Sequence, residues 1–173
     1  MLAAAAPRLL LAEPRLLLAD AARLMQSPPL LSSAGGLDLV RGVCESVART
    51  RQLTDAHLGQ LHFLCPDALP GAAEILDHKT VTRCVARTSG RRFHLVGSAA
   101  KRDYCVIRGF CTCMNYAFSV ASKPDALLCK HELAAELADA LDLALTSEYD
   151  DEEWAAKLEM FSRLDLESFM PKT

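Results

Sequence analysis

The chain has 173 residues, the length of one domain with room for a short extension. Hydrophobic residues make up 51% of it and charged residues 24%, the balance of a chain with a buried core. No stretch reaches about 18 consecutive uncharged apolar residues, so we expect no membrane-spanning helix. The seven cysteines are odd in number and follow no secretory signal pattern, which favours free or metal-bound thiols over a disulfide framework.

The formal net charge of −3 conceals two oppositely charged regions. From Lys79 to Arg108, eight basic residues stand against Asp103 alone, a net charge of +7. From Glu132 to Thr173, twelve acids stand against three basic residues, a net charge of −9. This asymmetry indicates two surfaces with different partners, and two solvated faces explain it equally well.

Residues 1–36 differ from the rest in composition. They contain a tandem repeat, PRLLLAE at Pro7–Glu13 and PRLLLAD at Pro14–Asp20, followed by "SPPLLSSAGG". A proline in every repeat opposes a long helix, and the serine, proline and glycine cluster is typical of a linker. We therefore expect a poorly ordered, dispensable extension. An organelle transit peptide is the alternative, and the two acids of the repeats argue against it.

Residues 37–78 form the predicted helical part of the domain. Apolar residues at helical spacing in "LDLVRGVCESVARTRQ" predict a first helix. A second helix follows Thr54, a suitable cap, and Pro66 and Pro70 are expected to end it. We expect two short antiparallel helices.

Residues 79–147 carry the predicted sheet and the metal-binding motif. "TVTRCVART" and "RFHLVGS" flank the turn "SGRR", a hairpin signature, and "RDYCVIRGF" predicts a third strand. "NYAFSVAS" predicts a short helix. From Leu133 to Leu145, apolar residues at helical spacing predict a long amphipathic helix, and residues 148–173 predict an acidic helix or tail. The fold class is therefore α+β.

Four metal-ligating residues occur as two closely spaced pairs, Cys111-x-Cys113 and Cys129-x-His131. In an extended segment, residues two apart point to the same face, so the first pair can hold one ion. On a helix, residues two apart diverge by roughly 200°. Cys129 should therefore precede the long helix and His131 should lie in its first turn. Mixed thiolate and imidazole sets favour zinc.

Three thiolates and a neutral imidazole around Zn²⁺ leave a net charge of −1, which Lys123 and Lys130 are close enough in sequence to offset. All four coordination positions are filled by protein, so no position is open for water or substrate. The sequence thus predicts one structural zinc ion. It would stabilise the domain by about 10 kcal/mol.

The motif C-x-C-x(n)-C-x-H, with "NYAFSV" after the first pair, is similar to the SWIM zinc finger. The run from Leu61 to about Leu145 resembles the small SWIM zinc finger family of the Shu complex, over roughly half the chain. The resemblance implies a ββα-like finger in which Cys111, Cys113, Cys129 and His131 bind zinc. It also implies a nuclear, non-catalytic protein that pairs with a RecA-like recombinase paralogue. Such a pair supports recombinase filaments on single-stranded DNA during homologous recombination.

Two other classes of function are alternatives to this adaptor. One is an independent nucleic-acid-binding SWIM finger in transcription, and the other is an enzyme such as a transposase or ubiquitin ligase. The chain has no room for a nuclease domain and no second, RING-like ligand set, so we expect no enzyme. Basic residues of the sheet region are candidates for contact with nucleic acid or with a partner protein. They are Arg87, Arg91, Arg92, Lys101, Arg102 and Arg108.

Overall fold

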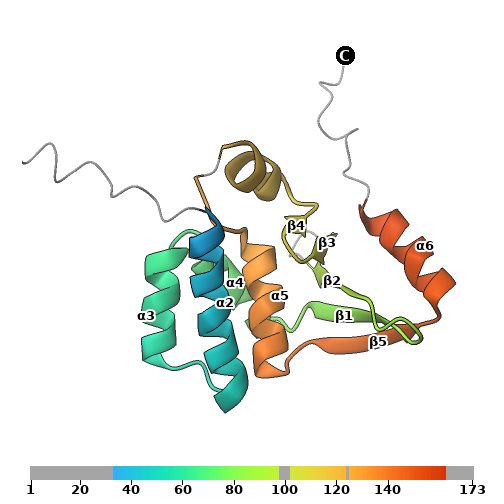
Figure 1. The fold of residues 1–173 in the computed structure, drawn as a ribbon, viewed down its shortest axis with the longest axis horizontal. Coiled ribbons are helices and arrows are strands. Elements are labelled where there is room, and N and C mark those ends of the chain that lie inside the picture. Colours follow the sequence, from blue (N-terminus) through green and yellow to red (C-terminus); the bar gives the residue numbers. More distant parts are fainter. Residues whose placement is uncertain (1–32, 98–101, 124, 163–173) are drawn as a thin grey trace, which may run out of the picture. The chain divides into compact units, whose positions relative to one another are not determined.

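The computed structural model describes residues 33–97, 102–123 and 125–162 (Figure 1). Within these residues the fold is α+β, with six helices and a five-stranded mixed sheet. The predicted extension, residues 1–36, lies mostly outside the described residues. Its last four residues belong to the first described helix, which begins at Ser33.

Three helices precede the sheet: α2 (Ser33–Thr50), α3 (Asp55–Leu64) and α4 (Leu69–Asp77). Thr54 caps α3, as predicted, and its partner in the capping box is His57. Two helices were predicted in this region, and α4 is an addition to them. Pro70 lies in the first turn of α4, where the missing N–H costs nothing, so it starts a helix rather than only ending one.

The sheet has the strand order β4-β3-β2-β1-β5. Strands β1 (Val81–Ala86), β2 (Arg92–Gly97) and β3 (Asp103–Ile107) are antiparallel neighbours, which confirms the predicted hairpin and third strand. The short β4 (Phe110–Cys111) pairs with β3 after a turn at Gly109. Gly109 adopts φ 78°, a left-handed conformation that glycine tolerates best.

The predicted long helix is α5 (Lys130–Leu141), and it ends before Leu145. Asp142 adopts the left-handed conformation (φ 60°) and terminates the helix. Leu145 instead begins β5 (Leu145–Tyr149), which runs parallel to β1 on the edge of the sheet. The prediction of helix through Leu145 was therefore wrong, because apolar spacing continued across a helix terminator.

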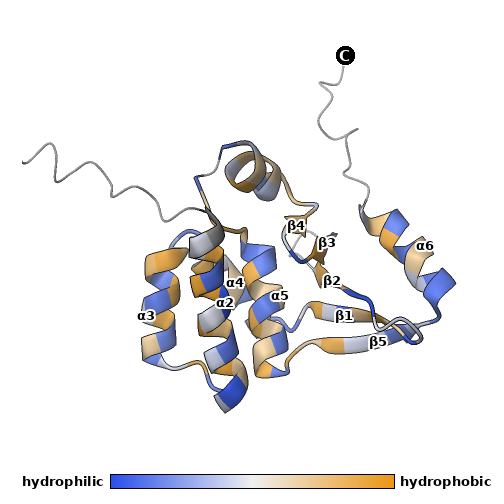
Figure 2. Ribbon diagram, in the orientation of Figure 1, coloured by the Kyte–Doolittle hydropathy of each residue, from blue (hydrophilic) through white to orange (hydrophobic). Residues whose placement is uncertain are grey.

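Helix α5 is also more central than an amphipathic surface helix. It contacts α2 and α4 on one side and the sheet on the other (Figure 1). Even Glu132, expected on its polar side, is buried. Helices α2, α5 and the acidic helix α6 (Asp151–Ser162) all mix hydrophilic and hydrophobic residues (Figure 2).

Two hydrophobic cores lie on opposite faces of the sheet. Alternation along β1 puts Val81 in the core beneath α5 and Cys84 in the core beneath α6. Cys44, Cys65, Cys84 and Cys105 are buried thiols, as expected. None of the helices in the described part of the chain combines the length and apolar character needed to cross a membrane.

Candidate metal centre

The four predicted ligands converge in the structure. The ligand atoms of Cys111, Cys113, Cys129 and His131 all lie within 4.8 Å of one another, and all four residues are buried. They come from the end of β4, the segment after it and the start of α5. Cys105, six residues before Cys111, is buried in the core beneath α6 and is not part of the cluster.

The first pair is held by the end of the sheet. Cys111 belongs to β4 and pairs with Val106 of β3. Thr112 extends this pairing, since its N–H donates to the Cys105 carbonyl (3.1 Å) and its hydroxyl accepts from the Cys105 N–H (3.0 Å). These two hydrogen bonds hold Thr112 in place, and the ligands Cys111 and Cys113 are its neighbours in the chain. The chain then enters a π-helix, η1 (Tyr116–Ser122), whose Tyr116 N–H donates to the Cys113 sulfur (3.3 Å).

The second pair lies at the N-terminus of α5, as the spacing predicted. Cys129 is the N-cap residue, in extended conformation, and His131 is in the first turn. Cys129 and Glu132 form a capping box: the Cys129 N–H donates to Glu132 Oε2 (3.2 Å), and the Glu132 N–H donates to the Cys129 sulfur. The ring of Tyr104 packs against His131, with 4.3 Å between ring centroids.

The donor set fits a zinc ion. Among the described residues, His131 Nδ1 is the one buried side-chain nitrogen or oxygen without a hydrogen-bond partner. The thiols compete for protons: hydrogen bonds with Cys113 and then Cys129 raise the pKa of Cys111. Hydrogen bonds from Cys111 and then Cys129 lower the pKa of Cys113. A divalent cation would replace the shared protons and satisfy the imidazole, which is the usual function of a Cys₃His zinc site.

The basic candidates lie in different surroundings. Arg87 pairs with Glu148 of β5 (3.6 Å), and Arg91 pairs with Asp151 of α6 (3.6 Å). Arg91 also lies over the Trp154 ring, 4.9 Å from its centroid. Of the other four candidates, Arg92 and Arg108 line a hollow beside α5, Arg102 lies 6.0 Å from the centroid of the Tyr104 ring, and Lys101 lies outside the described residues.

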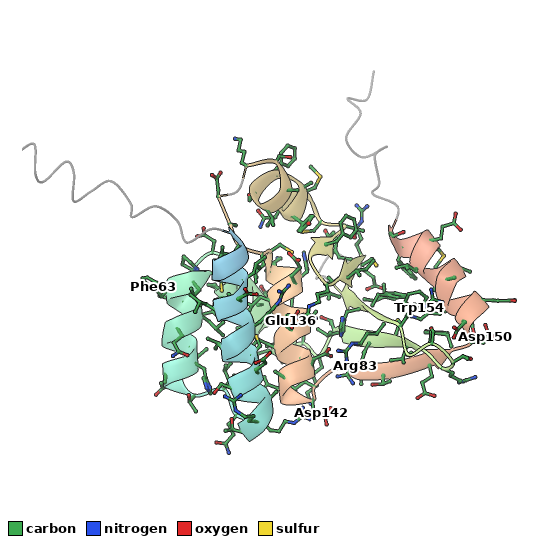
Figure 3. All side chains as sticks on the ribbon, in the orientation of Figure 1. Phe63, Arg83, Glu136, Asp142, Asp150 and Trp154 are labelled. Atoms are coloured by element: carbon green, nitrogen blue, oxygen red, sulfur yellow. The ribbon has the colours of Figure 1, made fainter. Side chains whose placement is uncertain are left out.

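Sequence reasoning missed the residues that support the cluster and α5. Glu132 stands three residues after Cys129, a capping-box spacing that the sequence displays. No comparable signal links Tyr104 to His131. No local signal links Asp139 to its partners either. Its carboxylate accepts a hydrogen bond from Arg83 Nε (2.8 Å) and lies 3.0 Å from His94 Nε2. Figure 3 shows Arg83 between α5 and the sheet.

Comparison with known proteins gives a family. Zinc finger SWIM domain-containing protein 7 of Homo sapiens is 31% identical over 106 residues, which cover 60% of this chain and 75% of the human protein. The Mus musculus protein of the same name is 32% identical over 106 residues, 69% of its length. This chain belongs to the zinc finger SWIM domain-containing protein 7 family. A family homologue from Dictyostelium discoideum is 28% identical over 139 residues, 79% of this chain and 85% of that protein.

No protein-family model and no solved structure matches the chain. The SWIM zinc finger in the family name agrees with the buried Cys₃His cluster, which is consistent with one zinc site. The resemblance drawn from the ligand spacing and the flanking segments is thus confirmed at the level of family.

Proposed function

We propose that the chain is a nuclear, non-catalytic adaptor in homologous recombination, which pairs with a RecA-like recombinase paralogue and supports recombinase filaments on single-stranded DNA. The observation that carries the proposal is a buried Cys₃His cluster in a member of the zinc finger SWIM domain-containing protein 7 family. All four donor atoms are protein side chains, so a bound zinc ion has no open position for substrate.

The zinc ion supplies structural stability in this proposal. Cys111, Cys113, Cys129 and His131 hold it, and they join the end of β4, the segment leading into η1 and the first turn of α5. These segments are separated by up to twenty residues, and they meet in the larger of the two cores. Loss of the ion would leave three buried thiolates that must take up protons and an imidazole nitrogen without a partner, so the finger would open.

Native affinity capture of the tagged full chain from nuclear extract tests the adaptor. We expect a RecA-like recombinase paralogue to co-purify in near-equal amounts. We also expect the purified pair to bind single-stranded DNA more tightly than the isolated chain. Absence of any RecA-like protein from the captured material, with zinc still present in the chain, would contradict the proposal.

An independent DNA-binding finger is the second candidate, and the arginines of the hairpin argue against it. Arg87 and Arg91 are paired with acids of β5 and α6, so phosphate groups would have to displace Glu148 and Asp151. The calculated isoelectric point near 5.9 is also far from that of a dedicated DNA-binding domain. Tight binding of single strands by the isolated chain at physiological salt would favour this candidate over the adaptor.

A further inference from the structure

A groove runs along α5 beside the metal centre, and the cluster itself does not explain it. It consists of two hollows of about 190 and 210 Å³, which share Gly109, Glu132 and Glu136. We call the two together the α5 groove. The volume of each hollow is below about 300 Å³, the lower end of the range for small-molecule pockets. Each hollow therefore has room for one or two side chains of a bound segment.

One end of the α5 groove is mostly apolar, with Arg41 as a charged residue besides the shared Glu132 and Glu136. It lies between α2, η1 and the segment before α5, and its apolar lining includes Leu37, Val40, Tyr116, Val120 and Leu127. Leu37, Tyr116, Val120 and Leu127 are only partly buried against the core. An aliphatic side chain placed here would cover them and gain about 25 cal/mol for each Å² of apolar surface removed from water.

The middle of the α5 groove carries a carboxylate without a partner. Glu136 is half-buried in both hollows, and Figure 3 labels it on α5. Within residues 33–97, 102–123 and 125–162, no side chain or backbone group pairs with it by a hydrogen bond or ion pair. Asp139, one turn further along α5, differs because Arg83 and His94 satisfy it.

The charge of Glu136 acts on its buried neighbours. Burial and then the charge of Glu136 raise the pKa of the Cys44 thiol to about 12. Glu136 shares its hollows with Arg41, Arg92 and Arg108, but none of these cations pairs with it, and a half-buried carboxylate that no cation or donor reaches is costly. The groove therefore favours a bound positive charge at this point.

The far end of the α5 groove carries two arginines, and its own acid, Asp139, is already paired with Arg83 and His94. Arg92 and Arg108 are exposed there, on the wall formed by β2 and the turn after β3. They would repel a cation at that end and favour an acidic side chain. Nucleic acid fits this groove poorly, since a phosphate tracking along it would pass Glu132 and Glu136.

We propose that the α5 groove binds a segment of a partner protein in which an aliphatic residue enters the apolar end and a neighbouring lysine or arginine pairs with Glu136. An acidic residue of the same segment faces Arg92 and Arg108. This inference rests on the proposed adaptor function, which requires a protein partner. It adds the place where that partner binds and the side chains that recognise it.

Site-specific cross-linking followed by a charge swap tests the groove. A photo-reactive benzoylphenylalanine replaces Arg41, which lines the groove and has no role in the proposed recognition, in the full chain in cells. A second chain carries it at Glu74, exposed on α4. Mass spectrometry identifies the cross-linked peptide. We expect the Arg41 position, and not Glu74, to capture one segment with a basic residue next to an aliphatic one.

The captured segment is then synthesised and its affinity measured. Glu136→Arg should weaken binding by about ten- to a hundredfold, the value of one charge-assisted hydrogen bond. The matched reversal Glu74→Arg should leave affinity unchanged. A peptide with its basic residue changed to glutamate should regain binding to the Glu136→Arg chain. Glu136→Gln serves in place of the reversal if Glu136→Arg lowers zinc content or melting temperature.

The outcomes separate this inference from the adaptor. A RecA-like protein that co-purifies equally with wild-type, Glu136→Arg and Glu74→Arg chains, with no cross-link at Arg41, overturns the groove and leaves the adaptor standing. A cross-linked segment with the expected chemistry from an unrelated protein supports the groove and contradicts the RecA-like partner. A captured segment without a basic residue overturns the groove.

Discussion

The two cores on opposite faces of the sheet are held together by different forces. The core beneath α5 joins four helices and includes the three cysteines of the metal cluster. The core beneath α6 has five buried residues and is centred on Trp154, whose indole N–H donates to the Cys84 carbonyl (3.1 Å). In our proposal the first core is stabilised by a zinc ion and by burial. The second core is stabilised by the buried aromatic pair Phe93 and Trp154 and by the Trp154 hydrogen bond.

Removal of a cluster ligand should produce the largest effect and should act on the first core. Cys129→Ala or His131→Ala should abolish zinc binding, with a loss on the order of 10 kcal/mol in the free energy of unfolding of the finger. Metal analysis and amide hydrogen exchange of β4, η1 and α5 provide the measurement. Cys105→Ala is the matched control, because it removes a buried thiol outside the cluster and should keep the zinc. Equal loss of zinc in both variants would contradict the assignment.

Trp154→Ala should break the second core while leaving the first intact. The substitution removes the edge-to-face contact with Phe93 (ring centroids 5.4 Å apart) and the hydrogen bond to Cys84. We expect a loss of about 3–5 kcal/mol in the free energy of unfolding, measured by denaturant titration. Zinc content should stay at the wild-type value. If zinc is lost as well, the two cores do not act independently.

Asp139 connects α5 to the sheet, and its replacement should have an intermediate effect. Burial alone would raise the pKa of Asp139, but hydrogen bonds from His94 and Arg83 outweigh it and hold the pKa below its usual value. A carboxyl with a lowered pKa contributes stability that is present above about pH 4 and is lost as pH falls through the folded-state value.

Asp139→Asn should therefore cost about 1–3 kcal/mol at neutral pH, since it weakens a partly buried pair. The difference in unfolding free energy between wild type and variant should shrink as the solution is acidified below about pH 4. Denaturant titrations at neutral and acidic pH measure it. A difference that stays constant with pH would show that Asp139 acts by packing alone.

Asp151→Asn should produce the smallest effect, confined to the turn of the β1–β2 hairpin. Asp151 Oδ1 accepts from the N–H groups of Thr88 (3.2 Å) and Ser89 (3.3 Å). The variant should exchange these two amide hydrogens faster, with little change in melting temperature, because the site is exposed. Unchanged exchange at both positions would show that the Asp151 side chain does not protect these two amides.

Local patterns in the sequence predicted those parts of the fold that short segments determine. The ligand spacing located the cluster, stereochemistry placed Cys129 before α5, and β-branched runs located the hairpin and third strand. Strand β5 could not be predicted because its parallel pairing with β1 joins residues far apart in the chain. The Arg83–Asp139 pair spans 56 residues and leaves no local signal either.

X-ray absorption at the zinc edge of the purified full chain tests the central claim most directly. We predict about one zinc per chain, coordinated by three sulfur atoms and one imidazole nitrogen, from Cys111, Cys113, Cys129 and His131. A folded, zinc-free protein, or a zinc ion surrounded mainly by oxygen, would contradict the account.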